Sequence, residues 1–396
     1  MAQSDITQAA DRPDLLRLLL EDASKAPGLF QPTNYWAGFK AKALAELEQC
    51  GLTDFRRRSG SVLSGFGATD TRAEHVIDMT DIKVRNKSLL ANRYTQRIPG
   101  WLAVQKGLNQ ALSRTVQVLP GCMEYLRQSK YATTKREGER SGARSLDQYE
   151  SSLVGNPEDV LEVNGRSYTT LSLYYYLSYA YCSRFVDFER LNTIVELGPG
   201  AGKQVEVIRK LHPRICFFLF DLPVQTYVCE QYLRSVFPEA VVGYEETRDL
   251  TETPSPEPGK LFIFGNWQFP ILKSGAKIDL FWNAASFQEM EPDIVANYLS
   301  YVDPRTEHAY LRETMDGKEL HADLGREGGV IEKTTLRHYR EGLPSLELLD
   351  VSFAKEPKAE LLPLLSRWNK KPMRHVPMDA RGFCDSFWRR CTDKSN

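Results

Sequence analysis

The stretch Thr193-Ile194-Val195-Glu196-Leu197-Gly198-Pro199-Gly200-Ala201-Gly202-Lys203-Gln204 decides the fold that this sequence predicts. A short apolar run ends in an acid, three glycines follow at alternate positions, and apolar residues then recur at helical spacing. This order is typical of a strand, a tight turn and a helix. Glycines let the backbone approach a ligand closely, and free N–H groups at a helix start attract an anionic group. The stretch therefore predicts a binding loop at the end of a strand.

A second acid lies at the end of the next apolar run. Residues 215–220 form that run, and Asp221 follows it directly. In nucleoside-binding α/β sheets, an acid at the end of the second strand accepts hydrogen bonds from ribose hydroxyls. The glycine stretch and Asp221 together predict a nucleoside site. The alternative is a turn that merely joins a strand to a helix, but a plain turn needs neither three glycines nor both acids.

The glycine spacing separates two classes of cofactor. A dinucleotide fingerprint requires G-x-G-x-x-G, but here the third glycine comes one residue early and Lys203 stands where that fingerprint needs glycine. The pattern E-x-G-x-G-x-G resembles the first motif of class I S-adenosylmethionine-dependent methyltransferases. The resemblance implies S-adenosyl-L-methionine as the cofactor. The residues that would bind it are Glu196, Gly198, Gly200, Gly202 and Asp221.

Composition is that of an ordinary globular protein. The chain has 396 residues, of which 42% are apolar and 26% charged, and its formal net charge is −1. This charge gives no support to bulk binding of nucleic acid or of an anionic membrane. The seven cysteines are scattered without a C-x-x-C pair, so neither a disulfide framework nor a zinc site is indicated. We expect a cytoplasmic protein, because residues 1–12 lack a signal-peptide pattern and no run approaches a membrane span.

From residue 192 onward, apolar runs of strand length alternate with helical patterns. Strands are predicted at 193–197, 215–220, 240–244, 261–264, 278–283 and 309–312, and helices at 203–211, 224–237 and 291–301. Such alternation predicts a mostly parallel sheet with helices on both faces, that is, a Rossmann-like α/β fold. Two late strands, 346–353 and 383–389, have no long helix between them and suit an antiparallel hairpin at one edge.

The N-terminal part predicts a mainly helical domain over residues 1–150, followed by a methyltransferase domain over 151–396. Helical patterns cover 13–23, 34–50 and 88–128. Residues 55–71 are predicted to form a loop whose arginines, 56–58, are solvated or alternatively bind a phosphate. The polar residues 131–150 are predicted to form a linker or lid, with a basic lip over an anionic substrate as the alternative.

Ligands of open α/β sheets bind beyond the carboxyl ends of the strands. This rule adds the residues that follow two later strands to the predicted crevice. Asn266 and Trp267 are candidates for an adenine slot, and Asn283 and Ser286 are candidates for contacts with cofactor or acceptor.

The block 279–290 makes the resemblance more specific. Together with Gly155-Asn156-Pro157 and the tyrosine-rich helix predicted at 171–185, it resembles a family of sugar O-methyltransferases over about residues 150–320. That resemblance implies a glycosyl hydroxyl as the acceptor. It also implies a histidine near position 285, where this chain has Ala285.

A poor nucleophile such as a sugar hydroxyl needs help in losing its proton. Glu289 and His321 are the candidate catalytic bases, while His308 is expected to be structural. Glu289 alternatively caps a helix start. His321 lies near Glu319 and Asp323, but this spacing matches no strong metal motif, so we predict no metal site.

The leading hypothesis is an O-methyltransferase acting on a sugar or glycosylated natural product, with a small-molecule acceptor such as a sugar or nucleotide-linked sugar. Methylation of a non-sugar oxygen or nitrogen in secondary metabolism stays open, as does a homodimer. A nicotinamide-dependent dehydrogenase and a non-catalytic binding module are the further alternatives.

Overall fold

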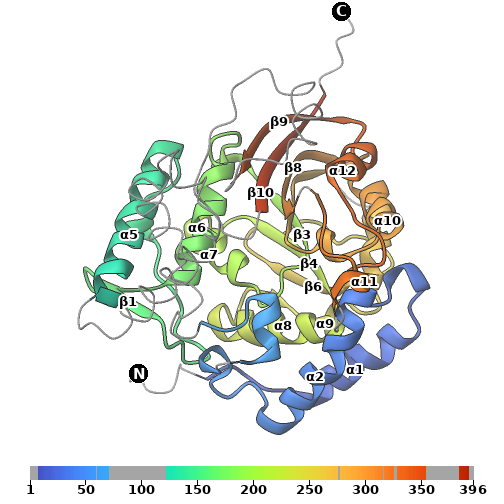
Figure 1. Ribbon diagram of the computed structural model, residues 1–396, viewed down its shortest axis with the longest axis horizontal. Helices are drawn as coiled ribbons and strands as arrows, with labels where there is room; N and C mark the ends of the chain where they lie inside the picture. The colour runs from blue at the N-terminus through green and yellow to red at the C-terminus, as the bar shows by residue number, and fades with distance from the viewer. Residues whose placement is uncertain are drawn as a thin grey trace, which may run out of the picture.

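The computed structural model describes residues 8–58, 60–70, 122–274, 277–314, 316–324, 328–353 and 383–391. In these ranges the chain builds one eight-stranded mixed sheet with the strand order β5-β6-β4-β3-β7-β8-β10-β9 (Figure 1). The strands are β3 (Thr193–Leu197), β4 (Cys216–Asp221), β5 (Val241–Val242), β6 (Leu261–Gly265), β7 (Ile278–Ala284), β8 (Thr306–Thr314), β9 (Leu346–Phe353) and β10 (Phe383–Arg390).

The first six of these strands pair in parallel, and β10 runs antiparallel to both β8 and β9. The two late strands therefore form the antiparallel edge that the sequence predicts. Strands β3 and β4 are buried along their whole length, as expected for parallel strands covered on both faces. Successive residues point to opposite faces, so Ile194 and Val195 belong to different hydrophobic clusters.

Helices cover both faces of the sheet (Figure 1). Apolar residues of α6 (Thr170–Cys182), α7 (Lys203–Leu211) and α8 (Pro223–Val236) join the cluster that contains Ile194. Those of α10 (Pro292–Val302) and α12 (Leu336–Gly342) join the cluster that contains Val195. The short helices α9 (Tyr244–Thr247) and α11 (His321–Leu324) lie in connections. The predicted α/β class, with a Rossmann-like sheet between helices, is confirmed.

The N-terminal region is helical in its described part. Helix α1 (Pro13–Ser24) packs along α8, and α2 (Asn34–Cys50) begins and ends at the predicted residues. Leu19 and Leu47 belong to the same hydrophobic cluster as the sheet residue Ile194. The predicted helical pattern of 88–128 lies outside the described residues up to position 121, and the boundary at residue 150 stays a prediction.

The polar segment 131–141 is helical, so the prediction of a linker over 131–150 is wrong for these residues. It forms most of α5 (Cys122–Ser141), which packs against α6 beside the hairpin of β1 (Val160–Val163) and β2 (Arg166–Thr169). Buried positions recur at 131, 134, 138 and 141, which is helical spacing. Three of them are Thr134, Gly138 and Ser141, whose small size allows close approach but gives no hydrophobic signal.

The prediction that Arg56 is solvated is also wrong. Its side chain is 1% exposed, and its guanidinium is paired with the Asp70 carboxylate. A charge run on the sequence does not reveal such a buried partner. Within the part of the chain that the structure describes, no helix is both long and apolar enough to cross a membrane.

Candidate active site

The glycine loop and Asp221 meet at the carboxyl ends of β3 and β4. Parallel pairing places Leu197 beside Phe220, and the N–H of Gly198 donates to the Phe220 carbonyl at 2.9 Å. Two residues further along the loop, the N–H of Gly200 donates to Asp221 Oδ2 at 2.9 Å. The second Asp221 oxygen, Oδ1, accepts from the N–H of Leu222 at 2.8 Å. The structure therefore brings together the loop and the acid that the sequence assigns to one site.

Two carboxyl groups, those of Glu196 and Asp221, share this buried place, and no cation among the described residues pairs with either. The pKa of Glu196 is raised to about 8, first by burial and then by repulsion from Asp221. The pKa of Asp221 is raised to about 7, chiefly by burial, although the N–H groups of Leu222 and Gly200 act in the opposite direction. Glu196 is 3% exposed and Asp221 9% exposed. Both acids would be stabilised in their ionised forms by a ligand that brings positive charge or hydroxyl donors.

All three loop glycines have positive φ angles, 80° for Gly198, 57° for Gly200 and 76° for Gly202. A Cβ atom at Gly198 would lie 2.7 Å from the Ser286 Cβ, and one at Gly200 would collide with the Phe66 carbonyl oxygen. A Cβ at Gly202 would meet α8 instead, 2.9 Å from Leu233 Cγ. Gly202 thus serves the packing of α7 on α8, while the other two permit close approach by segments distant in sequence.

The predicted ligand contacts Asn283 and Ser286 are occupied in holding the loop after β7. Asn283 Nδ2 donates to the Leu197 carbonyl at 2.9 Å and to Ser286 Oγ at 2.6 Å. Asn283 Oδ1 accepts from the N–H of Phe287 at 3.2 Å. These bonds tie the end of β7 to the end of β3, and they support Ala285 at a φ of 68°.

Asn266 and Trp267 follow β6 at the same edge of the sheet. Asn266 Nδ2 donates to the Phe30 carbonyl at 2.8 Å and to the Tyr298 hydroxyl at 2.9 Å, while its Oδ1 has no partner among the described residues. The Trp267 ring lies against Gly265 and meets Tyr244 edge-on at 5.8 Å. The amide nitrogen of Asn266 is therefore already hydrogen-bonded within the protein, and part of the Trp267 ring is already packed against Gly265 and Tyr244.

A cleft of about 330 Å³, including the part open to solvent, begins at the residue after Asp221. One wall is the start of α8 with Leu222, and the other is α2 with Trp36 and Phe39. Phe66 also lines the cleft, and the centroid of its ring lies 6.2 Å from that of Trp36. The other lining residues are Pro32, Lys40, Ala43, Pro223, Val224 and Gln225.

Sequence reasoning missed these aromatic residues. Trp36 and Phe39 lie on the side of α2 that helical periodicity assigns to a core, yet both are only half-buried. Periodicity alone does not distinguish an aromatic residue that lines a cleft from one that lies in a core.

Glu289 lies at this edge too, in a dense set of contacts. Its Oε1 accepts from Lys318 Nζ at 2.8 Å, and its Oε2 accepts from Trp36 Nε1 at 3.1 Å. Its main-chain carbonyl accepts from the Thr33 hydroxyl at 2.8 Å. Burial raises the pKa of Glu289, and Lys318 acts against this shift. A carboxylate with a raised pKa near the glycine loop is chemically suited to accept a proton.

The histidines are placed differently. His321 is exposed on α11, and its Nδ1 lies 2.7 Å from the Gly328 carbonyl oxygen. His308 lies in β8 with Nδ1 3.2 Å from the Asp279 carbonyl oxygen, and burial lowers its pKa. In the ranges that the structure describes, no group of three or more His, Cys, Asp or Glu side chains could hold a metal ion, which includes the set around His321.

No protein-family model matches this chain, and no curated protein matches it. Solved structures do resemble it. The mitomycin 7-O-methyltransferase is 13% identical, with 70% of each chain covered and a TM-score of 0.33. An O-methyltransferase from neocarzinostatin biosynthesis is 13% identical, with 56% of each chain covered and a TM-score of 0.34. Human N-acetylserotonin methyltransferase is 13% identical, with 56% of each chain covered and a TM-score of 0.30. Likeness at this level does not carry a function to this chain.

Proposed function

We propose that this chain is an S-adenosylmethionine-dependent O-methyltransferase. The observation that carries the proposal is the pair Glu196 and Asp221, two buried acids beside a glycine loop with no cation among the described residues to balance them. S-adenosylmethionine carries a sulfonium and an ammonium group together with two ribose hydroxyls. It therefore supplies both the positive charge and the hydrogen-bond donors that this site lacks.

The residues at the carboxyl edge fit the parts of such a cofactor. Among the described residues, the Asp221 carboxylate accepts from two backbone N–H groups, which leaves it acceptor capacity for ribose hydroxyls. The cleft begins at Leu222, the next residue, and the aromatic rings of Trp36, Phe39 and Phe66 in its lining are side chains on which adenine can stack. We prefer this cleft for the adenine over the slot predicted at Asn266 and Trp267. Glu196, the next-to-last residue of β3, is our candidate for a contact with the methionine part of the cofactor.

The cofactor supplies the methyl group, and the chain must orient the acceptor and remove its proton. Methyl transfer is a direct displacement, so alignment of the acceptor oxygen with the methyl group contributes much of the rate. Glu289 is our candidate for the base that takes the hydroxyl proton, and Lys318 and Trp36 hold its two oxygens. His321 is the weaker candidate, because it is exposed on a short helix.

The acceptor is proposed to be a hydroxyl of a sugar or glycosylated natural product, on the family resemblance of residues 150–320. A non-sugar small molecule that is methylated on oxygen or nitrogen is the second candidate, and Ala285, which stands where the sugar O-methyltransferase resemblance implies a histidine, favours it. A dinucleotide is disfavoured because its anionic pyrophosphate would lie at the glycine loop beside Glu196.

The test is isothermal titration of the purified protein with S-adenosylhomocysteine, repeated with Asp221→Ala and with NADH as the competing ligand. Micromolar binding that is lost in the variant supports the proposal. Binding of NADH in preference to S-adenosylhomocysteine would contradict it. Acceptors are then screened in two matched sets, glycosides and their aglycones, because the ratio of the two rates separates the candidate acceptor classes.

A further inference from the structure

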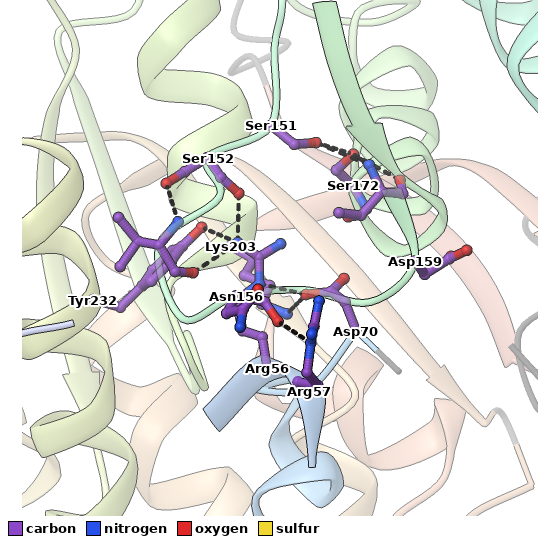
Figure 2. Close-up of polar contacts among 12 residues, drawn as sticks. Arg56, Arg57, Asp70, Ser151, Ser152, Asn156, Asp159, Ser172, Lys203 and Tyr232 are labelled. Carbon is purple, nitrogen blue, oxygen red and sulfur yellow. Dashed lines mark hydrogen bonds and ion pairs between the residues drawn. The ribbon is translucent and has the colours of Figure 1, made fainter. Parts of the chain in front are cut away.

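A buried cluster of three charges joins the N-terminal region to the helix that follows the glycine loop. Asp70 Oδ2 accepts from Arg56 Nε at 2.6 Å and also from Lys203 Nζ (Figure 2). The three residues are 1% to 4% exposed. Lys203 is the first residue of α7 and directly follows Gly202. One carboxylate therefore connects residues 56–70 to the start of α7.

Main-chain bonds hold Asp70 in place as well. Its N–H donates to the Arg56 carbonyl at 2.7 Å, and its carbonyl accepts from the N–H groups of Glu158 at 3.0 Å and Asp159 at 3.2 Å. The Arg56 guanidinium also donates to the Ser152 carbonyl at 2.6 Å. The segment 60–70, which we call the strap, is thus fixed at its C-terminal end by both its backbone and its charge.

The strap lies against the glycine loop. The Phe66 carbonyl oxygen occupies the space that a side chain at Gly200 would need, and its ring lines the cleft beside Leu222. The next residue, Gly67, has a φ of 73°, and the Tyr175 hydroxyl occupies the space that a side chain at Gly67 would need. Phe66 therefore contacts the glycine loop with its carbonyl group and lines the cleft with its ring. A shift of Phe66 would change both the loop and the cleft.

We propose that Asp70 and Lys203 are positioning residues, which hold the strap so that Phe66 forms one wall of the cofactor site. The inference rests on the proposed function and adds to it a contribution from the N-terminal region. Neither charged side chain needs to touch the cofactor, because each acts through the placement of Phe66. The ion pair explains why a lysine stands at the position where a dinucleotide fingerprint has glycine.

Lys203→Met is the informative variant. It removes the tie between the strap and α7, keeps an unbranched side chain of similar length, and leaves the Arg56–Asp70 pair in place to balance both remaining charges. Lys210→Met is the matched control. Lys210 lies on the same helix and pairs with Glu206 at 2.7 Å, but no contact joins it to the strap among the described residues.

The experiment measures S-adenosylhomocysteine affinity and dissociation rate for both variants, with trypsin cleavage after Arg57 and Arg58, the basic residues just before the strap, as the report on how firmly the strap is held. We expect Lys203→Met to bind S-adenosylhomocysteine about tenfold more weakly, because the ligand dissociates faster. Lys210→Met should behave as wild type. In the wild type, bound S-adenosylhomocysteine should slow cleavage at these arginines, a result that needs no variant.

Two outcomes would overturn the inference. One is equal affinity and dissociation in Lys203→Met and wild type, and the other is a cleavage rate that S-adenosylhomocysteine does not change. Either leaves the proposed function standing. A wild-type protein that binds no S-adenosylhomocysteine contradicts the proposed function itself and with it the inference.

Discussion

Asp221 and Gly200 are 21 residues apart in sequence, yet the Gly200 N–H donates to Asp221 Oδ2 at 2.9 Å. The bond links the conformation of the glycine loop to the ionisation of the acid, because a carboxylate accepts such a bond more strongly than a carboxylic acid does. Binding of a nucleoside at Asp221 is therefore expected to depend on pH.

Affinity for S-adenosylhomocysteine should fall as pH is lowered through about 7, the raised pKa of Asp221. If only the ionised form binds ribose, the loss approaches about tenfold per pH unit below that value. Titrations between pH 5.5 and 8.5, in buffers of equal ionic strength, measure it. Asp221→Asn should bind weakly with a flatter profile, whereas Asp279→Asn, at the opposite end of β7, should keep the wild-type slope. A flat wild-type profile would exclude an ionised Asp221 as the ribose contact.

Glu196→Gln should stabilise the ligand-free protein at pH 8 while weakening cofactor binding. The folded-state pKa of about 8 lies above the ordinary 4.5, so between these values the folded chain binds more protons than the unfolded chain. The unfolding free energy therefore falls as pH rises through this window, with an upper bound on the order of 4 kcal/mol for this group. Urea unfolding at pH 5 and pH 8 tests this, since the variant should show the smaller loss. A variant that is less stable at pH 8 would refute the expectation.

Gly200→Ala should weaken S-adenosylhomocysteine binding by about tenfold or more. The new Cβ collides with the Phe66 carbonyl oxygen, and the φ of 57° adds strain of about 1–2 kcal/mol. Gly165→Ala is the control, because its φ of 73° carries similar strain with open space around the added atom. Calorimetry and thermal melts of both variants separate the two effects. Equal losses of affinity would mean that strain alone matters.

Glu289→Gln and His321→Ala separate the two candidate bases. We expect Glu289→Gln to lower kcat by about 10²-fold or more, because the amide keeps the hydrogen-bonding shape but does not take up a proton. Its affinity for S-adenosylhomocysteine should stay close to wild type, and His321→Ala should change neither value. Initial rates with the acceptor found by screening provide the measurement. The reverse pattern would move the base to His321.

Gly138→Ala tests the packing of α5 on α6. Alanine in a helix interior is ordinarily more stable than glycine by about 1 kcal/mol. Here its Cβ would collide with the Tyr176 hydroxyl, so we expect a net destabilisation of about 1–3 kcal/mol. Denaturant unfolding measures the change, and the double variant Gly138→Ala/Tyr176→Phe should recover part of the loss. A stabilised single variant would contradict the close contact.

Features that depend on neighbours in sequence could be predicted. The alternation of apolar runs and helical patterns from residue 192 gave the sheet, and the motif around Gly198 together with Asp221 gave two segments that do meet. Local periodicity also placed α2 from Asn34 to Cys50. Each of these signals lies within one helix or strand, or at the carboxyl ends of two adjacent parallel strands.

Contacts between distant segments could not be predicted. Asp70 and Lys203 are 133 residues apart, and Trp36 and Glu289 are 253 apart, with no periodic pattern linking either pair. Helix α5 was missed because its buried side is built from Thr134, Gly138 and Ser141, which carry no apolar signal. The polar candidates at strand ends were predicted by their position in the sequence. Position does not reveal that the amide group of Asn283 already donates a hydrogen bond to the Leu197 carbonyl.

The distance along the chain between Asp70 and its lysine also affects synthesis. At about 5–20 residues per second, a ribosome needs roughly 7–27 s to add the 133 residues that separate them. During that interval Arg56 and Asp70 are already made, but the helix that encloses their charges is not. The nascent N-terminal segment is therefore expected to wait in a hydrated, unfinished state, and its final docking should be among the last steps of folding.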